Sequence, residues 1–269
     1  MHHPRIVTTL SLVAILGACQ TNPYTGRQTV NLLSEQEEAS LGEQAYAETK
    51  AKEKPHIITS GAQFDQVQRV AKAIANASDD LARKRGEKPS FQWECILIDS
   101  PQVNAWCLPG GKMGVYTGIL PVTQTDAGLA VVLGHEVAHA VSRHGGRRVT
   151  EGMLTEYAQQ AVAAGFSSSS PTTQTALMQA MGMGSQLAVA LPFSRTDESE
   201  ADHVGLILMA SAGYDPKEAP KFWQRMSSKA GGSAPPEFLS THPSDETRIQ
   251  NLNKWIPEAE KYYKTGAPR

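Results

Sequence analysis

The sequence has 269 residues, of which 40% are hydrophobic and 19% charged, an ordinary composition for one globular domain with a substantial core. The formal net charge is −2, so the chain has no basic excess to attract a polyanion, and nucleic-acid binding is excluded as its main role. The sequence also contains no internal repeat that would indicate a solenoid.

The N-terminal residues 1–18 have the features of a secretory signal. A short polar start precedes residues 6–17, an apolar segment that is too short to span a bilayer. It ends in Leu16-Gly17-Ala18-Cys19, which resembles a bacterial lipobox, so we expect cleavage before Cys19 and acylation of that cysteine; an ordinary signal peptide is the alternative. Residues 19–33 would then form a polar, turn-rich tether that leads from a membrane anchor.

Residues 34–116 contain two predicted helices followed by strands. Ser34-Glu35-Gln36-Glu37 is a capping box that opens a helix to about Lys52, and apolar spacing predicts a second helix over residues 61–85. Alternating residues 91–98 predict a strand, and residues 104–116 predict a strand, a Pro-Gly-Gly turn and another strand.

Two cysteines remain if Cys19 is acylated. Cys95 and Cys107 fall in neighbouring predicted strands. In an oxidising compartment a disulfide between them and a pair of free buried thiols are equally expected.

The most informative stretch is His135-Glu136-Val137-Ala138-His139, an H-E-x-x-H pattern in a helix predicted from Asp126 to about His144. Residues four apart lie on one helical face, so His135 and His139 can bind a single Zn²⁺. Glu136 lies beside that face, where it can deprotonate a water molecule. A chance match on a buried helix is the competing interpretation, but an unpaired His-Glu-His set would be costly to bury in such apolar surroundings.

Helical patterns continue to the C-terminus. Gly145-Gly146 is expected to break the zinc helix, and a low-complexity loop covers residues 167–171. Five further helices are predicted at about residues 147–166, 172–191, 194–212, 216–226 and 245–255.

A catalytic zinc ion needs a third protein ligand, which helical geometry selects from the acidic residues after Ser194. Glu198 and Asp202 are four residues apart and share a face, whereas Glu200 lies about 200° from Glu198 and points elsewhere. We therefore predict that Glu198 is the ligand and that Asp202 accepts the free N–H of a zinc-bound histidine.

Two other histidines are predicted to stay away from the metal. His144 is nine residues after His135, about 180° round a continuous helix, and so cannot reach the same ion. His203 follows Asp202 and is expected to face solvent.

Together these motifs resemble peptidase family M48, the minigluzincins. The resemblance rests on H-E-x-x-H, on Glu198-Ser-Glu-Ala-Asp202 preceded by Ser194-Arg195, and on Asn104-Ala-Trp, Thr241-His242-Pro243-Ser244 and Arg248. It runs from about Leu32 to Ile256. It implies an α+β fold: a mainly helical, zincin-like metallopeptidase domain over residues 34–269, with a small antiparallel sheet beside the H-E-x-x-H helix. Within the family, the lipobox makes the chain most similar to periplasmic lipoproteins of the LoiP type; the related periplasmic protease BepA differs in its C-terminal helical repeats.

The resemblance also suggests roles for three residues outside the zinc helix. Asn104 would lie on an edge strand that accepts the substrate backbone, although it could equally be a turn residue of a core hairpin. His242 would lie on a loop that can reach the open position of the zinc ion as a self-inhibiting switch; it could instead stabilise the oxyanion or simply cap a helix. Arg248 is a candidate partner for a carboxylate or for the oxyanion.

The expected function is that of a zinc-dependent metalloendopeptidase with one Zn²⁺ per chain. By resemblance it lies in the bacterial periplasm, is held by a lipid anchor at Cys19, and cleaves unfolded or misassembled periplasmic and outer-membrane proteins. Gln20 after the acylated cysteine favours the outer membrane. The alternative is a chaperone-like assembly lipoprotein with latent, His-switched proteolysis, and a purely structural zinc site is disfavoured because such sites use four Cys or His ligands.

Overall fold

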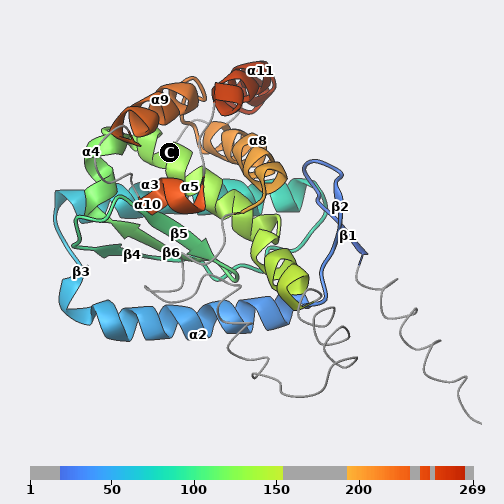
Figure 1. Ribbon diagram of the computed structural model, residues 1–269, viewed down its shortest axis with the longest axis horizontal. Helices are drawn as coiled ribbons and strands as arrows, with labels where there is room; N and C mark the ends of the chain where they lie inside the picture. The colour runs from blue at the N-terminus through green and yellow to red at the C-terminus, as the bar shows by residue number, and fades with distance from the viewer. Residues whose placement is uncertain (1–18, 154–192, 231–236, 243–245, 264–269) are drawn as a thin grey trace, which may run out of the picture.

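The structure is a computed structural model and describes residues 19–153, 193–230, 237–242 and 246–263 (Figure 1). The expected class is confirmed: helices predominate and enclose a small sheet. The predicted signal segment, residues 1–18, and the helices predicted over residues 154–191 lie outside the described residues. Within the described residues, no helix has the length and apolar character needed to cross a bilayer.

The central sheet has four strands in the order β3-β4-β6-β5. Its β5–β6 hairpin is antiparallel, as expected, but β4 and β6 run parallel, so the sheet is mixed rather than wholly antiparallel. The reason is the path of the chain. Strand β5 starts at the end of the sheet where β4 stops and forms the outer edge, which leaves an open position between them that β6 fills. The strands are β3 (Ile57–Ile58), β4 (Glu94–Ile98), β5 (Ala105–Leu108) and β6 (Lys112–Tyr116).

Inserting β6 also determines whether the two strand cysteines can form a disulfide. Cys95 and Cys107 both pair with Met113 of β6, one from each side, so they lie two strands apart. That separation is about 9.5 Å, beyond the roughly 7 Å limit for a disulfide. Both cysteines are accordingly free.

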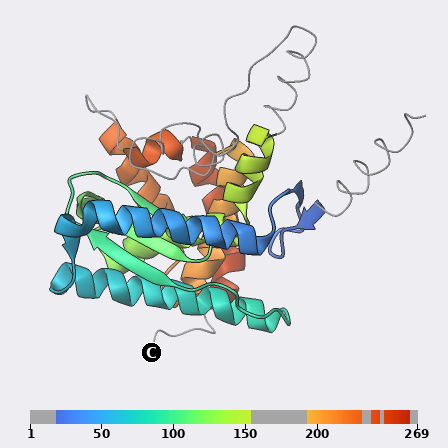
Figure 2. The ribbon, with the colours of Figure 1, turned by 90° about the horizontal axis from the view of Figure 1, so that it is seen from below.

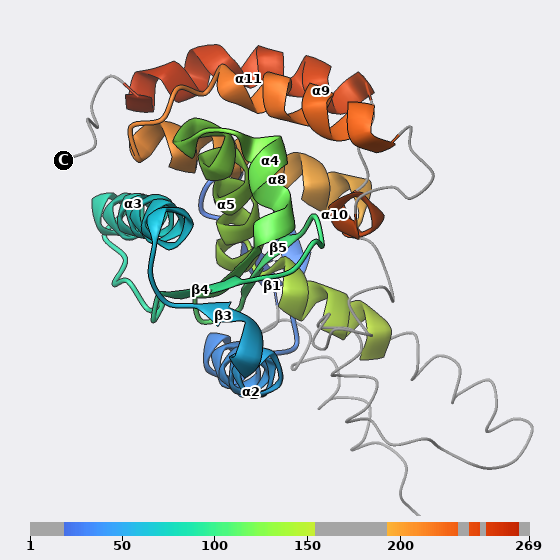
Figure 3. The same ribbon diagram turned by 90° about the vertical axis from the view of Figure 1, so that its left-hand side faces the viewer.

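Helices cover both faces of the sheet. Figure 2, from below, shows α2 in front of the strands, and Figure 3 shows α3 and α5 on the opposite face. Tyr46 of α2 packs with Ile96 and Ile98, whereas Leu97, on the other face of β4, belongs to the main core with α3 and α5. The three helices are α2 (Glu35–Glu53), α3 (Ala62–Lys84) and α5 (Asp126–Val141). The expected capping box is present at the start of α2, where Ser34 Oγ accepts a hydrogen bond from the backbone N–H of Glu37.

The C-terminal helices form a layer over α5. Helix α8 packs along α5, and α9 and α11 lie outside this pair (Figure 3). These helices are α8 (Arg195–Ser211), α9 (Glu218–Ala230), α10 (Glu237–Thr241), which the sequence pattern did not predict, and α11 (Glu246–Tyr263). Short connections are η1 (Lys54–His56), η2 (Thr117–Ile119) and α4 (Leu120–Thr123).

The segment expected to be a tether, residues 19–33, includes a β-hairpin. Strands β1 (Cys19–Thr21) and β2 (Gln28–Val30) pair with Cys19 opposite Val30. The turn between them is closed by a hydrogen bond from the N–H of Asn22 to the carbonyl of Arg27, 2.7 Å long. This hairpin, residues 19–30, contacts the start of α8 through Arg27.

Helix α5 ends earlier than its sequence pattern predicts. It stops at Val141, and after Arg143, which adopts φ 57°, residues 144–153 form a separate helix. The guanidinium of Arg143 holds this turn by donating to Glu38 Oε1 at 2.7 Å and to the carbonyl of Leu33 at 2.6 Å. The predicted break at Gly145-Gly146 is therefore wrong, because both glycines lie inside the second helix. A Cβ atom on Gly146 would overlap the Glu38 carboxylate, so glycine here permits close packing.

Candidate active site

Helix α5 presents two buried imidazoles from one face. His135 and His139 lie one turn apart, with their Nε2 atoms separated by 3.0 Å. Both side chains are almost completely buried, at 2% and 3% exposure. An α-helical spacing of four residues is what brings the two nitrogens together.

Helix α8 supplies a carboxylate to the same point. Ser194 caps this helix by accepting from the N–H of Asp197, which places Glu198 in the first turn. Glu198 Oε2 lies 3.5 Å from His135 Nε2, and Glu198 Oε1 lies 3.3 Å from His139 Nε2. Although burial works to raise the pKa of Glu198, the neighbouring histidines outweigh it and hold that pKa well below its usual range.

The geometry of these three donors fits Zn²⁺. A tetrahedral zinc ion with ligands at about 2.0–2.1 Å has ligand–ligand edges of about 3.3–3.4 Å. The two imidazole nitrogens are 3.0 Å apart, and the Glu198 carboxylate approaches them through both of its oxygens, with Oε1 3.3 Å from His139 Nε2 and Oε2 3.5 Å from His135 Nε2. Lone pairs that converge this closely in a buried site repel one another unless a cation lies between them. The arrangement can therefore bind one divalent ion.

A second carboxylate fixes the orientation of His135. Asp202 Oδ1 lies 2.9 Å from His135 Nδ1, so this nitrogen carries the proton and Nε2 turns its lone pair towards the site. Arg248 in turn holds Asp202, with 2.6 Å between Arg248 Nε and Asp202 Oδ2, and reaches Glu198 Oε2 at 3.1 Å. Its guanidinium lies 3.4 Å from the ring centre of Trp223, which limits its movement.

His242, at the end of α10, belongs to the same group. Its Nδ1 atom lies 3.1 Å from His135 Nε2 and 2.9 Å from Glu198 Oε1. The donor atoms of His135, His139, Glu198 and His242 all lie within 4.8 Å of one another. A fourth protein ligand is therefore within reach of any ion that the other three bind.

Glu136 faces this group from the zinc helix. Its Oε1 atom is buried, makes no hydrogen bond within the described residues, and lies 3.3 Å from His242 Nε2. Burial raises the pKa of Glu136 to about 7. A carboxylate with this pKa can both accept and release a proton near neutral pH.

Asn104 occupies a different environment from the metal-binding group. It is buried directly before β5, where its Oδ1 accepts from the N–H of Ala105 at 2.9 Å and its carbonyl accepts from the N–H of Tyr116. Strand β5 is one of the two edge strands of the sheet and packs against α5. The side chain of Asn104 thus stabilises the start of the edge strand.

Glu200 and His144, both predicted to lie away from the metal, contact each other. Glu200 points away from the donor group, and its Oε2 atom lies 2.9 Å from His144 Nε2. His203 was expected to face solvent but is half-buried, because its ring stacks on Trp255 and its Nε2 pairs with Glu258.

Aromatic side chains that carry no motif complete the walls of the site. The ring centre of Phe193 lies 4.1 Å from that of His139, and the ring of Trp223 lies 5.8 Å from that of His135. Phe238 of α10 lies 4.6 Å from His242. The sequence offers no signal for these residues, because they come from three separate segments with no spacing relation to the histidines.

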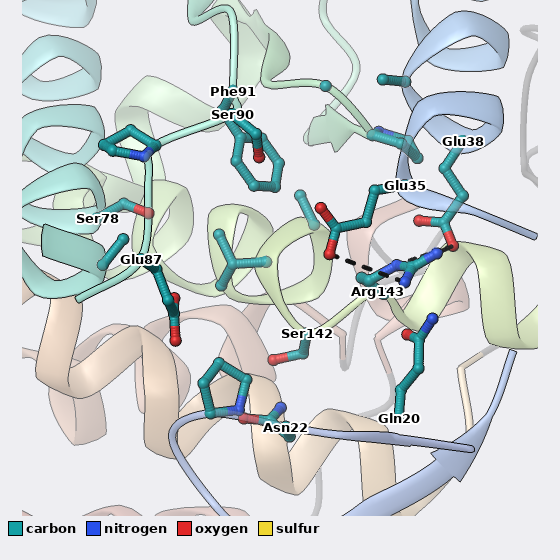
Figure 4. A pocket seen from close by; sticks show the side chains of 18 of the residues that line it. Gln20, Asn22, Glu35, Glu38, Ser78, Glu87, Ser90, Phe91, Ser142 and Arg143 are labelled. Atoms are coloured by element: carbon teal, nitrogen blue, oxygen red, sulfur yellow. Dashed lines mark hydrogen bonds and ion pairs between the residues drawn. The ribbon is translucent and has the colours of Figure 1, made fainter. Parts of the chain in front are cut away.

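A cavity of about 790 Å³ lies near the C-terminal end of α5, among the β1–β2 hairpin, α2 and α3. Figure 4 shows Arg143 and its partners Glu35 and Glu38 in its wall. None of the four donor residues lines this cavity. It is therefore separate from the metal-binding group.

This donor set, with a carboxylate facing it, is characteristic of metallopeptidases of the H-E-x-x-H type. The chain belongs to peptidase family M48, whose family model matches residues 62–256. Members of this family are zinc-dependent, in agreement with the metal-binding group described above.

Curated relatives support this membership. The mitochondrial metalloendopeptidase OMA1 of Arabidopsis thaliana is 34% identical over 238 residues, which cover 88% of this chain and 45% of that protein. OMA1 of Schizosaccharomyces pombe is 34% identical over 241 residues, covering 88% of this chain and 66% of that protein. The putative beta-barrel assembly-enhancing protease of Vibrio cholerae is 32% identical over 158 residues, covering 57% of this chain and 32% of that protein. The chain spans about half the length of the curated relatives it matches.

Proposed function

We propose that this protein is a zinc-dependent endopeptidase in which His135, His139 and Glu198 bind the metal and Glu136 is the general base. The observation that carries the proposal is the convergence of these three donors, with separations that fit a zinc tetrahedron, beside a carboxylate with a raised pKa. Bound Zn²⁺ supplies Lewis acidity, which acidifies water and polarises the scissile carbonyl.

The protein's own residues then move the proton. Glu136 takes it from the attacking water and passes it to the leaving amine, as a buried carboxylate with a raised pKa can do. Asp202 and Arg248 keep His135 in the tautomer that offers Nε2 to the metal.

Extended polypeptide is the substrate class that the fold supports best. Strand β5 is an edge strand of the sheet and packs against the helix that contains His135 and His139. A substrate bound as an added strand would be recognised mainly through its backbone, which favours unfolded or misassembled proteins over a folded target.

We further propose that the enzyme acts in the bacterial cell envelope and is anchored by lipid at Cys19. The outer membrane is favoured over the inner membrane as the site of this anchor. The lipobox-like Leu16-Gly17-Ala18-Cys19 and the Gln20 that follows support this. Bacterial relatives from Vibrio cholerae and Yersinia pestis bear the name beta-barrel assembly-enhancing protease, while those named OMA1 are mitochondrial, so quality control of envelope proteins is the proposed process.

A second candidate function is a chaperone-like assembly lipoprotein with latent proteolysis. The observation in its favour is His242, which lies within 3.1 Å of His135 Nε2 and occupies the side of the metal group that faces Glu136. An imidazole bound to the metal there would exclude the attacking water and silence the enzyme until its loop moved.

Replacing Glu136 by glutamine tests the endopeptidase proposal. We expect one zinc per chain in both wild type and Glu136→Gln, and a loss of at least about 10²-fold in cleavage of an unfolded protein by the variant. Glu258→Gln, which changes a carboxylate that pairs with His203 elsewhere on the surface, should cleave like wild type. A wild-type protein without zinc, or full cleavage by Glu136→Gln, would overturn the proposal.

A further inference from the structure

A second buried polar cluster lies beside the metal group, where α8, the segment after α5 and the β1–β2 hairpin meet (Figure 1). It consists of His144, Asp197 and Glu200, none of them more than 7% exposed. None of these three residues has a part in the proposed reaction.

Hydrogen bonds connect this cluster to the metal group in a defined order. His139 Nδ1 lies 2.9 Å from His144 Nδ1, and His144 Nε2 lies 2.9 Å from Glu200 Oε2. The ionised carboxylate of Glu200 can only accept, so His144 donates from Nε2 and accepts at Nδ1. His139 must then donate from its Nδ1, which leaves the lone pair of His139 Nε2 directed at the metal.

The far end of this chain is held by the hairpin. Arg27 Nη1 lies 2.9 Å from Glu200 Oε2 and 2.9 Å from Asp197 Oδ1. The hydroxyl of Thr25 donates to Glu200 Oε1. A continuous chain of hydrogen bonds therefore connects Thr25 and Arg27 of the hairpin to His139 of the metal group.

The cluster is not itself a metal site. Its two carboxylates are already neutralised by two guanidinium groups, Arg27 and Arg147, the latter paired with Asp197. A divalent ion would have to displace both arginines from a buried position.

We propose that His144 and Glu200 are positioning residues for the metal ligand His139, and that the hairpin, residues 19–30, keeps them in place. The inference rests on the proposed role of His139 as a ligand. Asp202 accepts the Nδ1 proton of His135 directly, whereas the Nδ1 proton of His139 is accepted by a second imidazole, that of His144. Because the hairpin supports a ligand, zinc binding and hairpin docking must stabilise each other.

Zinc affinity is the direct test, measured by competition with a chromophoric chelator. We expect His144→Ala to raise the zinc dissociation constant about 10- to 100-fold, the usual effect of removing the hydrogen-bond partner of a metal-bound histidine. Glu200→Gln keeps an acceptor oxygen but loses the charge, so its effect should be smaller. His203→Ala is the matched control, since it removes a histidine–glutamate pair of the same length, 2.9 Å, that also involves α8 but does not touch the metal group.

Two further measurements separate positioning from a purely structural role. Cobalt-substituted His144→Ala should have a shifted visible absorption spectrum, because the ligand field changes when His139 turns. A lower unfolding midpoint with unchanged zinc affinity and an unchanged cobalt spectrum would overturn the proposal. If His144→Ala does not fold, Arg27→Ala tests the same chain from its half-buried end and should weaken zinc binding several-fold; unchanged binding there overturns the proposal equally.

Hydrogen exchange tests the coupling to the hairpin. Adding zinc to the metal-free full-length protein should slow amide exchange over residues 19–30 in wild type and in His203→Ala but not in His144→Ala. Equal slowing in all three would contradict the proposed relay. A wild-type protein that binds no zinc would instead overturn the endopeptidase proposal, so the two failures are distinguishable.

Discussion

Gly134 and Gly205 touch where α5 crosses α8. A Cβ atom built on Gly134 would lie 2.8 Å from the carbonyl oxygen of Gly205, and one built on Gly205 would lie 2.9 Å from the backbone nitrogen of His135. Only glycine at both positions lets the two backbones approach this closely. The approach matters for function, because it brings Glu198 of one helix to the two histidines of the other.

Gly205→Ala should therefore impair both stability and metal binding. Its methyl group meets backbone atoms that cannot rotate away, so the helices must separate, at a cost of about 1–3 kcal/mol in the free energy of unfolding. Separation also moves Glu198 from the histidines, and we expect zinc affinity to fall at least tenfold. Chemical denaturation and chelator competition measure the two effects.

Gly145→Ala is the matched control for this substitution. Gly145 is also helical, but a Cβ atom there would meet Pro109 Cγ at 3.8 Å, an ordinary contact. Alanine is the better helix former by about 1 kcal/mol, so this variant should be as stable as wild type or more so. Equal behaviour of the Gly145 and Gly205 variants would contradict the role assigned to the helix crossing.

His242→Ala distinguishes the switch from the oxyanion role. If His242 blocks the metal from its position 3.1 Å from His135 Nε2, removing the imidazole opens a coordination position and cleavage of an unfolded substrate should rise several-fold. If His242 instead stabilises the oxyanion, kcat should fall about 10²-fold. Steady-state kinetics of zinc-loaded protein decide between them, with His203→Ala expected to match wild type. We expect the increase, and an equal or lower rate would rule out autoinhibition.

The thiol of Cys95 should be unreactive at physiological pH. Burial raises its pKa to about 12, and the thiolate is the reactive form, so at pH 8 only about one molecule in 10⁴ is reactive. Alkylation by iodoacetamide should be slow in the folded protein, speed up as pH rises towards 12, and become fast in denaturant. Cys19 is exposed and serves as the reactive control in unacylated protein. A disulfide-linked peptide pair containing Cys95 and Cys107 would contradict the strand order of the sheet.

The residues of the metal group could be predicted from the sequence because their spacing is local. His135 and His139 are four residues apart, as are Glu198 and Asp202. Each pair lies in an α-helix of the structure, where this spacing places both side chains on one face. His144 does lie outside the donor group, as predicted, but the reason given for it was wrong, because it assumed a helix that continued past Val141. The helix ends at a turn that Arg143 stabilises by its contact with Glu38, 105 residues earlier in the chain. No local sequence pattern predicts such a contact.

The strand order of the sheet and the docking of the hairpin could not be predicted, because both depend on contacts between segments far apart in the sequence. Cys95 and Cys107 are close along the chain, yet β6, which comes later, inserts between their strands. Residues 19–33 have the composition of a tether, yet Arg27 forms ion pairs with the buried carboxylates of Asp197 and Glu200, which are 170 and 173 residues away in the chain. Each outcome depends on partners that become neighbours only in the folded chain.

Removing the metal should lower the thermal stability of the protein. Without a cation, the donors of His135, His139 and Glu198 face one another at 3.0–3.5 Å in a buried site, an unfavourable arrangement that zinc relieves. Zinc at 100 times its dissociation constant contributes about 2.7 kcal/mol. For a chain of this size that is a shift of about 5–10 °C in the unfolding midpoint, measurable by calorimetry with and without EDTA. The double variant His135→Ala/His139→Ala should unfold at one temperature in both conditions, because only Glu198 and His242 remain of the donor group. A wild-type midpoint insensitive to EDTA would mean that the three donors do not hold an ion.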